Sequence, residues 1–265
     1  MNEASNPIRY VQYKSGSWQE VSGSVIAERA VSLTVNGEVW LTLMCTPVDL
    51  EALAIGFLYN ENTIQSISEV ASVRVCPTGD NIDVWLNFSV ERPKDWRRTS
   101  GCTGGATSSD PASTSPVVQD GIVLAARDIC SLIERLLDSQ ELYRDVGGVH
   151  TSALSDGKEI LVSADDIGRH NTLDKIAGRC LLDQIESSHR VLLTTGRISS
   201  EMMQKAARIG ASIVISRTSP SSLSIELAQR YGITLIGYAR RDRYNIYTYP
   251  ERILQNSDSV ENVVF

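Results

Sequence analysis

The stretch RVLLTTGRISSEMMQKAARIGASIVIS, residues 190–216, decides the fold. It contains an apolar strand at 190–194, a helix that begins after Ser199 and ends at Gly210, and a second apolar strand at 212–215. Apolar strands this short are typical of a sheet covered on both faces, and the helices between them typically connect parallel strands. The stretch therefore predicts a layered α/β domain with a parallel or mixed sheet.

The same alternation of helix and strand continues on both sides of this stretch. Apolar side chains recur at helical spacing in three further segments, and Gly232 ends the last of them. We expect residues 120–252 to form one α/β domain and the polar residues 253–265 to form a tail. The other predicted helices lie near 122–136, 173–181 and 220–231, and the other predicted strands lie at 143–149, 159–163, 233–236 and 244–247.

Residues 1–95 predict a smaller, β-rich part with one helix. Apolar and polar side chains alternate on both sides of Asn36-Gly37, which is a strong signal for a β-hairpin. A helix with one apolar face follows at 50–58. Residues 96–119 are rich in Ser, Thr, Gly and Pro and predict a linker between the two parts. Further strands are predicted at 8–13, 73–75 and 82–88.

The composition argues against several classes of protein. The chain has 265 residues and a formal net charge of −7, which does not suit a surface built for nucleic acid. No apolar run approaches the roughly 20 residues that a membrane helix needs, and the N-terminus lacks the pattern of a secretory signal. Five cysteines without CxxC spacing argue against a disulfide scaffold and a structural zinc site. We expect a cytoplasmic protein that holds no metal and binds neither nucleic acid nor membrane.

The linker contains RRTSGCTGGAT, residues 97–107, with Cys102 at its centre. Glycines on both sides of the cysteine let the backbone bend and let another molecule approach the sulfur closely. Two arginines at the start of the segment favour the reactive thiolate form. Two interpretations are open: a covalent sulfur nucleophile, or a surface linker with an incidental cysteine.

Polar side chains gather at the ends of the predicted strands, where ligands of open α/β sheets bind. His150 follows a glycine pair and either carries a proton or packs in the core. Arg169 and His170 stand at a helix start, where free amides and a guanidinium suit an anion. His170 can instead pair with Asp174, one turn further along the helix. Arg197 opens a helix directly after a buried strand, which again suits an anionic ligand.

The segment GYARRDR, residues 237–243, follows another predicted core strand. Its three arginines form either a solvated run of charge or a contact for an anion or a guanine nucleotide, and Tyr238 can stack on a flat ring. Arginine binds phosphate through two parallel hydrogen bonds. Taken together, the strand ends predict a pocket for a phosphate-bearing ligand on an acidic protein.

Several strings in fixed order resemble the formate dehydrogenase accessory sulfurtransferase family, FdhD. Each string is weak alone, but their order and density from about Val31 to Tyr249 make the resemblance specific. The strings are NGEVWLTLMCTPVDLEALAIGFLYNENTI, the Cys102 loop, GGVHTSAL, DDIGRHNTLDK, TTGRISSEMMQKAA and SRTSPSSLSIELAQRYGITLIGYARRDRYNIYT.

The resemblance implies a sulfur carrier with sulfurtransferase activity. Such a protein accepts sulfur from a cysteine desulfurase as a persulfide, here on Cys102, and delivers it to the molybdenum cofactor, bis-molybdopterin guanine dinucleotide, for formate dehydrogenase. It also implies a cytidine deaminase-like fold and a homodimer. Arg169, His170 and Arg197 are predicted as further contacts of the same ligand. The cofactor-binding segment of the family corresponds to Tyr238, Ala239, Arg240, Arg241, Asp242 and Arg243.

The sequence departs from the family at one position. Many members carry CxxC in the loop, whereas Gly105 stands at the second cysteine position here. A persulfide carrier needs only one cysteine, so the departure leaves sulfur carriage possible. It removes the second thiol that a sulfur relay or a disulfide within the loop would need. Cys45 and Cys76 are expected to pack in the core. Zinc deaminase motifs are missing around His150, so we expect no deamination. The alternative function is a chaperone that binds the same cofactor without covalent chemistry.

Overall fold

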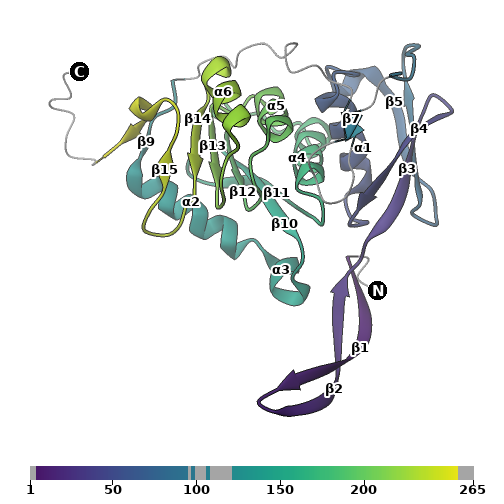
Figure 1. Ribbon diagram of the computed structural model, residues 1–265. Helices are drawn as coiled ribbons and strands as arrows, with labels where there is room; N and C mark the ends of the chain where they lie inside the picture. Colours follow the sequence, from purple (N-terminus) through teal and green to yellow (C-terminus); the bar gives the residue numbers. More distant parts are fainter. Residues whose placement is uncertain (1–3, 95–96, 99–105, 108–120, 256–265) are drawn as a thin grey trace.

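A six-stranded sheet forms the centre of the protein (Figure 1). Its strands are His150–Ser155 (β10), Ile160–Asp166 (β11), Val191–Thr194 (β12), Ile213–Ser216 (β13), Thr234–Gly237 (β14) and Asn245–Ile246 (β15). The structure is a computed structural model that describes residues 4–94, 97–98, 106–107 and 121–255. The strand order is β11-β10-β12-β13-β14-β15; β12, β13 and β14 are parallel, and every other neighbouring pair is antiparallel. The expected α/β fold with a mixed sheet is confirmed.

Helices cover both faces of this sheet, which gives three layers (Figure 1). One helix packs on one face and three pack on the other. Along β12, Leu193 joins the core under the single helix, whereas Leu192 joins the core under the other three. Because successive side chains of a strand point to opposite faces, every residue of β12 must be apolar or buried. The single helix is Ala126–Asp138 (α2), and the other three are Arg169–Leu182 (α4), Ser200–Ile209 (α5) and Ser222–Tyr231 (α6).

The strand predicted at 143–149 is wrong, because most of that segment forms the short helix Glu141–Val146 (α3). The aromatic and β-branched residues that suggested a strand do not pack in the sheet; Tyr143 is 51% exposed. Only Leu142 of the helix is buried. Gly147, with φ 67°, ends the helix in a conformation that glycine adopts readily.

The predicted tail begins later than expected. Ile253–Leu254 (β16) pairs in parallel with Leu124–Ala125 (β9), and Ile253 is buried in the core on the α2 side. This pair joins the end of the α/β domain to its beginning. An apolar dipeptide is too short to be recognised as a strand without its partner, which lies more than a hundred residues earlier in the sequence.

The N-terminal part contains a four-stranded sheet in the order β4-β3-β6-β5, with one helix packed on it. Asn36 and Gly37 have φ values of 49° and 84°, as the two central residues of a type I′ hairpin turn require. The predicted hairpin is therefore confirmed. The elements are Arg29–Val35 (β3), Glu38–Cys45 (β4), Leu50–Asn60 (α1), Val70–Val75 (β5) and Asn81–Leu86 (β6), with a 3-10 turn at Ile67–Glu69.

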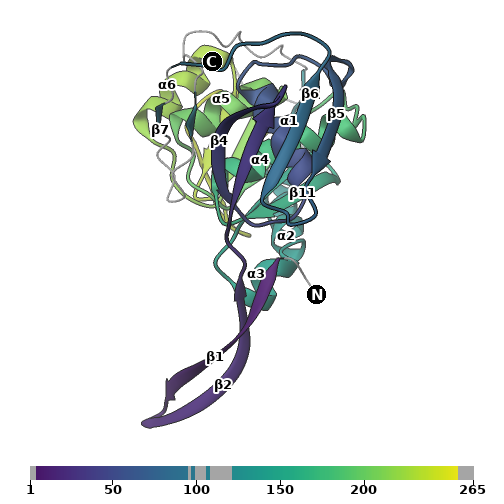
Figure 2. The same cartoon turned by 90° about the vertical axis from the view of Figure 1, so that its right-hand side faces the viewer.

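A long hairpin formed by Ser5–Lys14 (β1) and Ser17–Ile26 (β2) projects from the rest of the protein, as Figures 1 and 2 both show. The sequence predicted only the strand at 8–13. The second strand was missed because its sequence does not alternate between apolar and polar residues. Neither face of the hairpin is buried, so nothing requires such an alternation. Its large exposed apolar side chains are Ile8, Tyr10, Val11, Tyr13, Trp18 and Val25.

Helix α1 joins the N-terminal part to the α/β domain by packing against α4 (Figure 2). Two glycines let the helix backbones approach closely. A Cβ atom on Gly56 would lie 1.7 Å from the carbonyl oxygen of Asp174, and one on Gly178 would lie 1.9 Å from that of Ala52. Any side chain at either position would therefore collide with the backbone of the opposite helix.

Candidate functional site

One edge of the central sheet carries the polar side chains that the sequence singled out. β11, β12, β13 and β14 run in the same direction and end at this edge, and β10 begins there because His150 pairs with Asp166. The structure thus places His150, Arg169, Arg197 and the segment 238–243 along one side of the sheet. Strand ends of this kind are the usual ligand site of open α/β sheets.

The strongest concentration of positive charge at this edge is a hollow of about 400 Å³, which we call the arginine hollow. It contains four arginines against one aspartate, on a chain whose net charge is −7. Such a hollow attracts anions, and guanidinium groups match phosphate oxygens in pairs. Its lining residues are Leu137, Arg217, Arg240, Arg241, Asp242 and Arg243.

Backbone contacts fix the shape of the arginine hollow. The Arg240 guanidinium donates to the carbonyl oxygens of Arg217 and Ala239, and the Arg240 amide donates to the Arg243 carbonyl at 2.7 Å. Tyr238, two residues before Arg240 in the sequence, has a φ of 52° and is 47% exposed, so its ring is open to a flat ligand. Ala239 is fully buried, so its methyl group is closed to a ligand.

Arg217 is a lining residue that the sequence analysis did not select. It follows β13, and its only signal was the strand-to-helix plan of the segment RTSPSSLS. Burial lowers the pKa of its guanidinium, and the positive charges of Arg240 and Arg241 lower it further. The arginines therefore repel one another, and a bound anion would relieve that repulsion.

A second hollow, of about 410 Å³, lies where α5 and α6 begin, and we call it the serine hollow. Ile198 bridges to Pro220, and the Ser221 amide donates to the Ile198 carbonyl at 2.9 Å, so the two helix starts lie side by side. Ser199 and Ser221 cap their helices, so α6 begins at Ser222 rather than at the expected residue 220. The lining residues are Arg169, Arg197, Ile198, Ser199, Ser200, Glu201, Ser219, Pro220, Ser221 and Leu223.

Both histidines of this edge are held neutral. Burial, then the charges of Lys205 and Arg169, lower the pKa of His170 to about 2. Burial and the nearby Arg169 likewise lower the pKa of His150. His170 does not pair with Asp174, because Lys205 donates to both oxygens of that carboxylate at 2.6 Å. Neither histidine is therefore a cationic contact for an anion near neutral pH.

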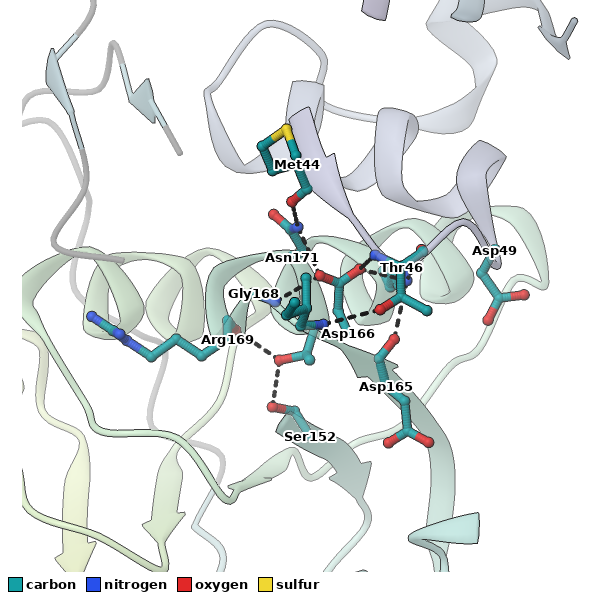
Figure 3. Close-up of polar contacts among 12 residues, drawn as sticks. Met44, Thr46, Asp49, Ser152, Asp165, Asp166, Gly168, Arg169 and Asn171 are labelled. Atoms are coloured by element: carbon teal, nitrogen blue, oxygen red, sulfur yellow. Dashed lines mark hydrogen bonds and ion pairs between the residues drawn. The ribbon is translucent and has the colours of Figure 1, made fainter. Parts of the chain in front are cut away.

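A buried polar cluster holds the first turn of α4 in place (Figure 3). The Asp166 carboxylate lies 2.7 Å from the Lys175 ammonium, and both side chains are fully buried. Asp166 also accepts from the Gly168 amide at 2.7 Å and from the Asn171 amide group at 2.8 Å. The Thr46 amide, at the end of β4, donates to the same carboxylate at 3.1 Å. The cluster therefore ties the N-terminal sheet to the helix that begins with Arg169.

Comparison with known proteins finds relatives over most of the chain. A family model described as the FdhD/NarQ family matches residues 26–254. The chain belongs to this family. Relatives from Staphylococcus aureus strains MRSA252 and Newman, each named Sulfur carrier protein FdhD, are 34% identical over 252 residues, or 93% of this chain and 95% of the relative. The crystal structure of a candidate formate dehydrogenase accessory protein from Desulfotalea psychrophila matches with 35% identity and a TM-score of 0.80, covering 95% of this chain and all of that one.

The cysteines of this FdhD/NarQ protein differ in their surroundings. Cys102 lies outside the described residues; the strands Arg97–Arg98 (β7) and Ala106–Thr107 (β8) pair on either side of its segment. Cys45 is buried as expected, and burial raises its pKa to about 12. The expectation for Cys76 is wrong, because it lies half-buried in the β5–β6 turn, where its thiol donates to Asp80 at 2.9 Å.

Two searches of the described residues concern metals and membranes. Within residues 4–94 and 121–255, together with the short β7 and β8 strands, no three His, Cys, Asp or Glu side chains gather as metal ligands. In the same part of the chain, no helix is long and apolar enough to span a bilayer.

Proposed function

We propose that this FdhD/NarQ protein is a cytoplasmic sulfur carrier and sulfurtransferase. It would pass persulfide sulfur from a cysteine desulfurase to bis-molybdopterin guanine dinucleotide, the molybdenum cofactor that formate dehydrogenase needs. The name of the Staphylococcus aureus relatives supports sulfur carriage, and the Desulfotalea psychrophila structure supports the link to formate dehydrogenase. The observation that carries the proposal is the arginine hollow, a cationic pocket at the strand ends of an acidic protein.

Cys102 is the proposed carrier of the sulfur. Its thiolate attacks the outer sulfur of the desulfurase persulfide; the new S–S bond forms on Cys102, and the desulfurase cysteine leaves as a thiolate without net oxidation. On delivery, the outer sulfur leaves Cys102 for the molybdenum. Two electrons from the reduced metal convert that sulfur to sulfide, and Cys102 returns to the thiolate.

The arginine hollow is the proposed site for a guanosine phosphate of the cargo. Arg217, Arg240, Arg241 and Arg243 supply donors in a pocket large enough for a nucleotide. The exposed ring of Tyr238 can stack on the guanine. Within the segment 238–243, Asp242 lines the same hollow. The carbonyl of Ala239 accepts a hydrogen bond from the Arg240 guanidinium and so fixes its position. Arg169, His170 and Arg197 stay a prediction as further contacts.

We also propose a homodimer in which a second copy covers the β1–β2 hairpin. A two-stranded sheet without further strands is only marginally stable in water. The hairpin has two strands of 10 residues each, and together they approach the roughly 20–30 residues that each partner contributes to a standard protein–protein interface. Only Arg9, Lys14 and Glu20 are charged among them, so little charge repulsion opposes the contact. Sedimentation at micromolar concentration should show a dimer that Trp18→Ser weakens; a monomeric wild type would refute the dimer.

The direct test replaces Cys102 by alanine. Cells whose only copy carries Cys102→Ala should make formate dehydrogenase without activity, whereas Cys76→Ala, at a half-buried thiol, should leave activity intact. Mass spectrometry after incubation with desulfurase and cysteine should show the mass of one added sulfur on Cys102 of the wild type. Full enzyme activity with Cys102→Ala would remove the mechanism.

A chaperone that binds the cofactor without covalent chemistry is the second candidate. The arginine hollow favours it, because none of the described residues that line the hollow is a cysteine. This function predicts that Cys102→Ala stays active in cells while Arg243→Ala does not. The same pair of variants therefore separates the two candidates in one experiment.

A further inference from the structure

The serine hollow is distinct from the arginine hollow, although both lie on the same edge of the sheet. The segment between β13 and α6 divides them, since Arg217 lines one and Ser219, two residues further, lines the other. Arg169 and Arg197 line the serine hollow and are not among the described residues that line the arginine hollow. The sequence suggested one pocket for all of these arginines, whereas the structure divides them between two.

We propose that the serine hollow binds a phosphate or pyrophosphate group and forms a second subsite for the ligand whose first phosphorylated arm occupies the arginine hollow. The sharing of one ligand between the two subsites rests on the proposed function; the phosphate subsite itself does not. A phosphate needs positive charge and several hydrogen-bond donors that converge on a small volume. The serine hollow supplies both.

Positive charge reaches the serine hollow from three helices. Arg169 is the first residue of α4, and Arg197 lies just before α5. α5 and α6, each 10 residues long, begin side by side at the hollow, and each helix start carries roughly half a positive charge. Among the described residues of the lining Glu201 is the one acidic side chain, so the arginines and helix starts outweigh it.

Arg169 is built into the wall of the hollow. Only 5% of the residue is exposed. A Cβ atom on Gly196 would lie 2.9 Å from the Arg169 Cβ and 3.2 Å from its Cδ, so the glycine makes room for the arginine stem. The Asp166–Lys175 cluster fixes the helix start that carries Arg169. An arginine held in this way loses little side-chain entropy when it binds an anion.

Two histidines near the hollow report its positive potential. Burial is the main cause that lowers the pKa of both His150 and His170; the charge of Arg169 lowers both further, and the charge of Arg197 also lowers that of His150. The positive charge of the two arginines is therefore felt by their neighbours, as expected for a site that attracts an anion.

Serine hydroxyls supply the remaining donors and acceptors. Ser200, Ser219 and Ser221 line the hollow beside the two arginines and are partly or fully exposed. Its volume of about 410 Å³ falls in the range of small-ligand pockets. Pyrophosphate, or the diphosphate of a nucleotide, is therefore the ligand class that the hollow accommodates.

The test is calorimetric titration of the full chain with inorganic pyrophosphate. Wild type should bind two pyrophosphates, and Arg197→Ala, at an exposed position, should weaken one of them by about 10- to 100-fold. Arg243→Ala should weaken the other. Arg230→Ala, at the exposed far end of α6, is the matched control and should change neither. An unchanged titration of Arg197→Ala would overturn the phosphate subsite, whereas an unchanged Arg243→Ala would count against the proposed function alone.

Diguanosine pentaphosphate, a probe with two nucleotide arms, tests whether one ligand occupies both subsites. It should bind one molecule per chain, and Arg197→Ala and Arg243→Ala should each weaken it. If Arg197→Ala weakens pyrophosphate but leaves the two-armed probe unchanged, the serine hollow serves free phosphate, and the shared ligand is refuted.

Discussion

Replacing Gly56 by alanine should separate α1 from α4 and destabilise the protein. The new Cβ would lie 1.7 Å from the Asp174 carbonyl oxygen and 2.6 Å from the Gly178 amide nitrogen, whereas ordinary contact begins at 3.4 Å. Both obstacles are backbone atoms, so no side-chain rotation relieves the collision. The helices must move apart along a seam that also buries Ala52 and Asn60, whose amide group donates to the Asp174 carboxylate.

Overpacking of this kind costs about 1–3 kcal/mol, and the upper end applies because the backbone itself must shift. Alanine regains up to about 1 kcal/mol of helix propensity, so we expect a net loss of about 2 kcal/mol. Urea unfolding followed by circular dichroism measures this loss, which corresponds to a fall in Tm of about 4–8 °C. Gly23→Ala, which meets only the movable Tyr10 side chain, is the control and should cost far less. A Gly56→Ala protein as stable as wild type would refute the close contact.

Three further perturbations test the buried groups. Asp166→Ala leaves the Lys175 ammonium buried without its partner and should cost about 3–5 kcal/mol of unfolding free energy, and adding Lys175→Met should recover part of it; no recovery in urea unfolding would contradict the pair. His170 stays neutral when folded because its pKa falls from 6.5 to about 2, so below pH 6.5 the unfolded chain binds a proton that the folded one does not. As the pH falls below 6.5, the free energy of unfolding should therefore decrease by up to about 1.4 kcal/mol per pH unit because of this residue, and His170→Gln should reduce that slope. Equal slopes for wild type and variant would be inconsistent with a neutral imidazole. Iodoacetamide at neutral pH should leave Cys45 unlabelled while Cys102 reacts, as peptide mass mapping would show; rapid labelling of Cys45 would rule out its burial.

The sequence predicted the α/β domain because short-range physics controls its elements. The apolar strand 191–194 must be covered on both faces, and Ser199 and Gly210 satisfy the ends of one helix within a few residues. Asn36-Gly37 likewise sets its hairpin turn locally. The helix at 141–146 was missed because Tyr143, a residue typical of strands, faces solvent there, where propensity competes with local helix hydrogen bonds.

The sequence by itself determined most strands and helices of the α/β domain, though neither α3 nor β10, and it showed which strand ends carry arginine. Only the tertiary structure decided how those arginines divide between two hollows, because the order of neighbouring strands sets which strand-end segments meet. Only the folded chain could show that Asp174 pairs with Lys205, which lies 31 residues away in the sequence, rather than with His170, which lies four residues away. Side chains four residues apart on a helix can meet, but burial decides which partner a charge must have, and burial depends on packing between distant segments.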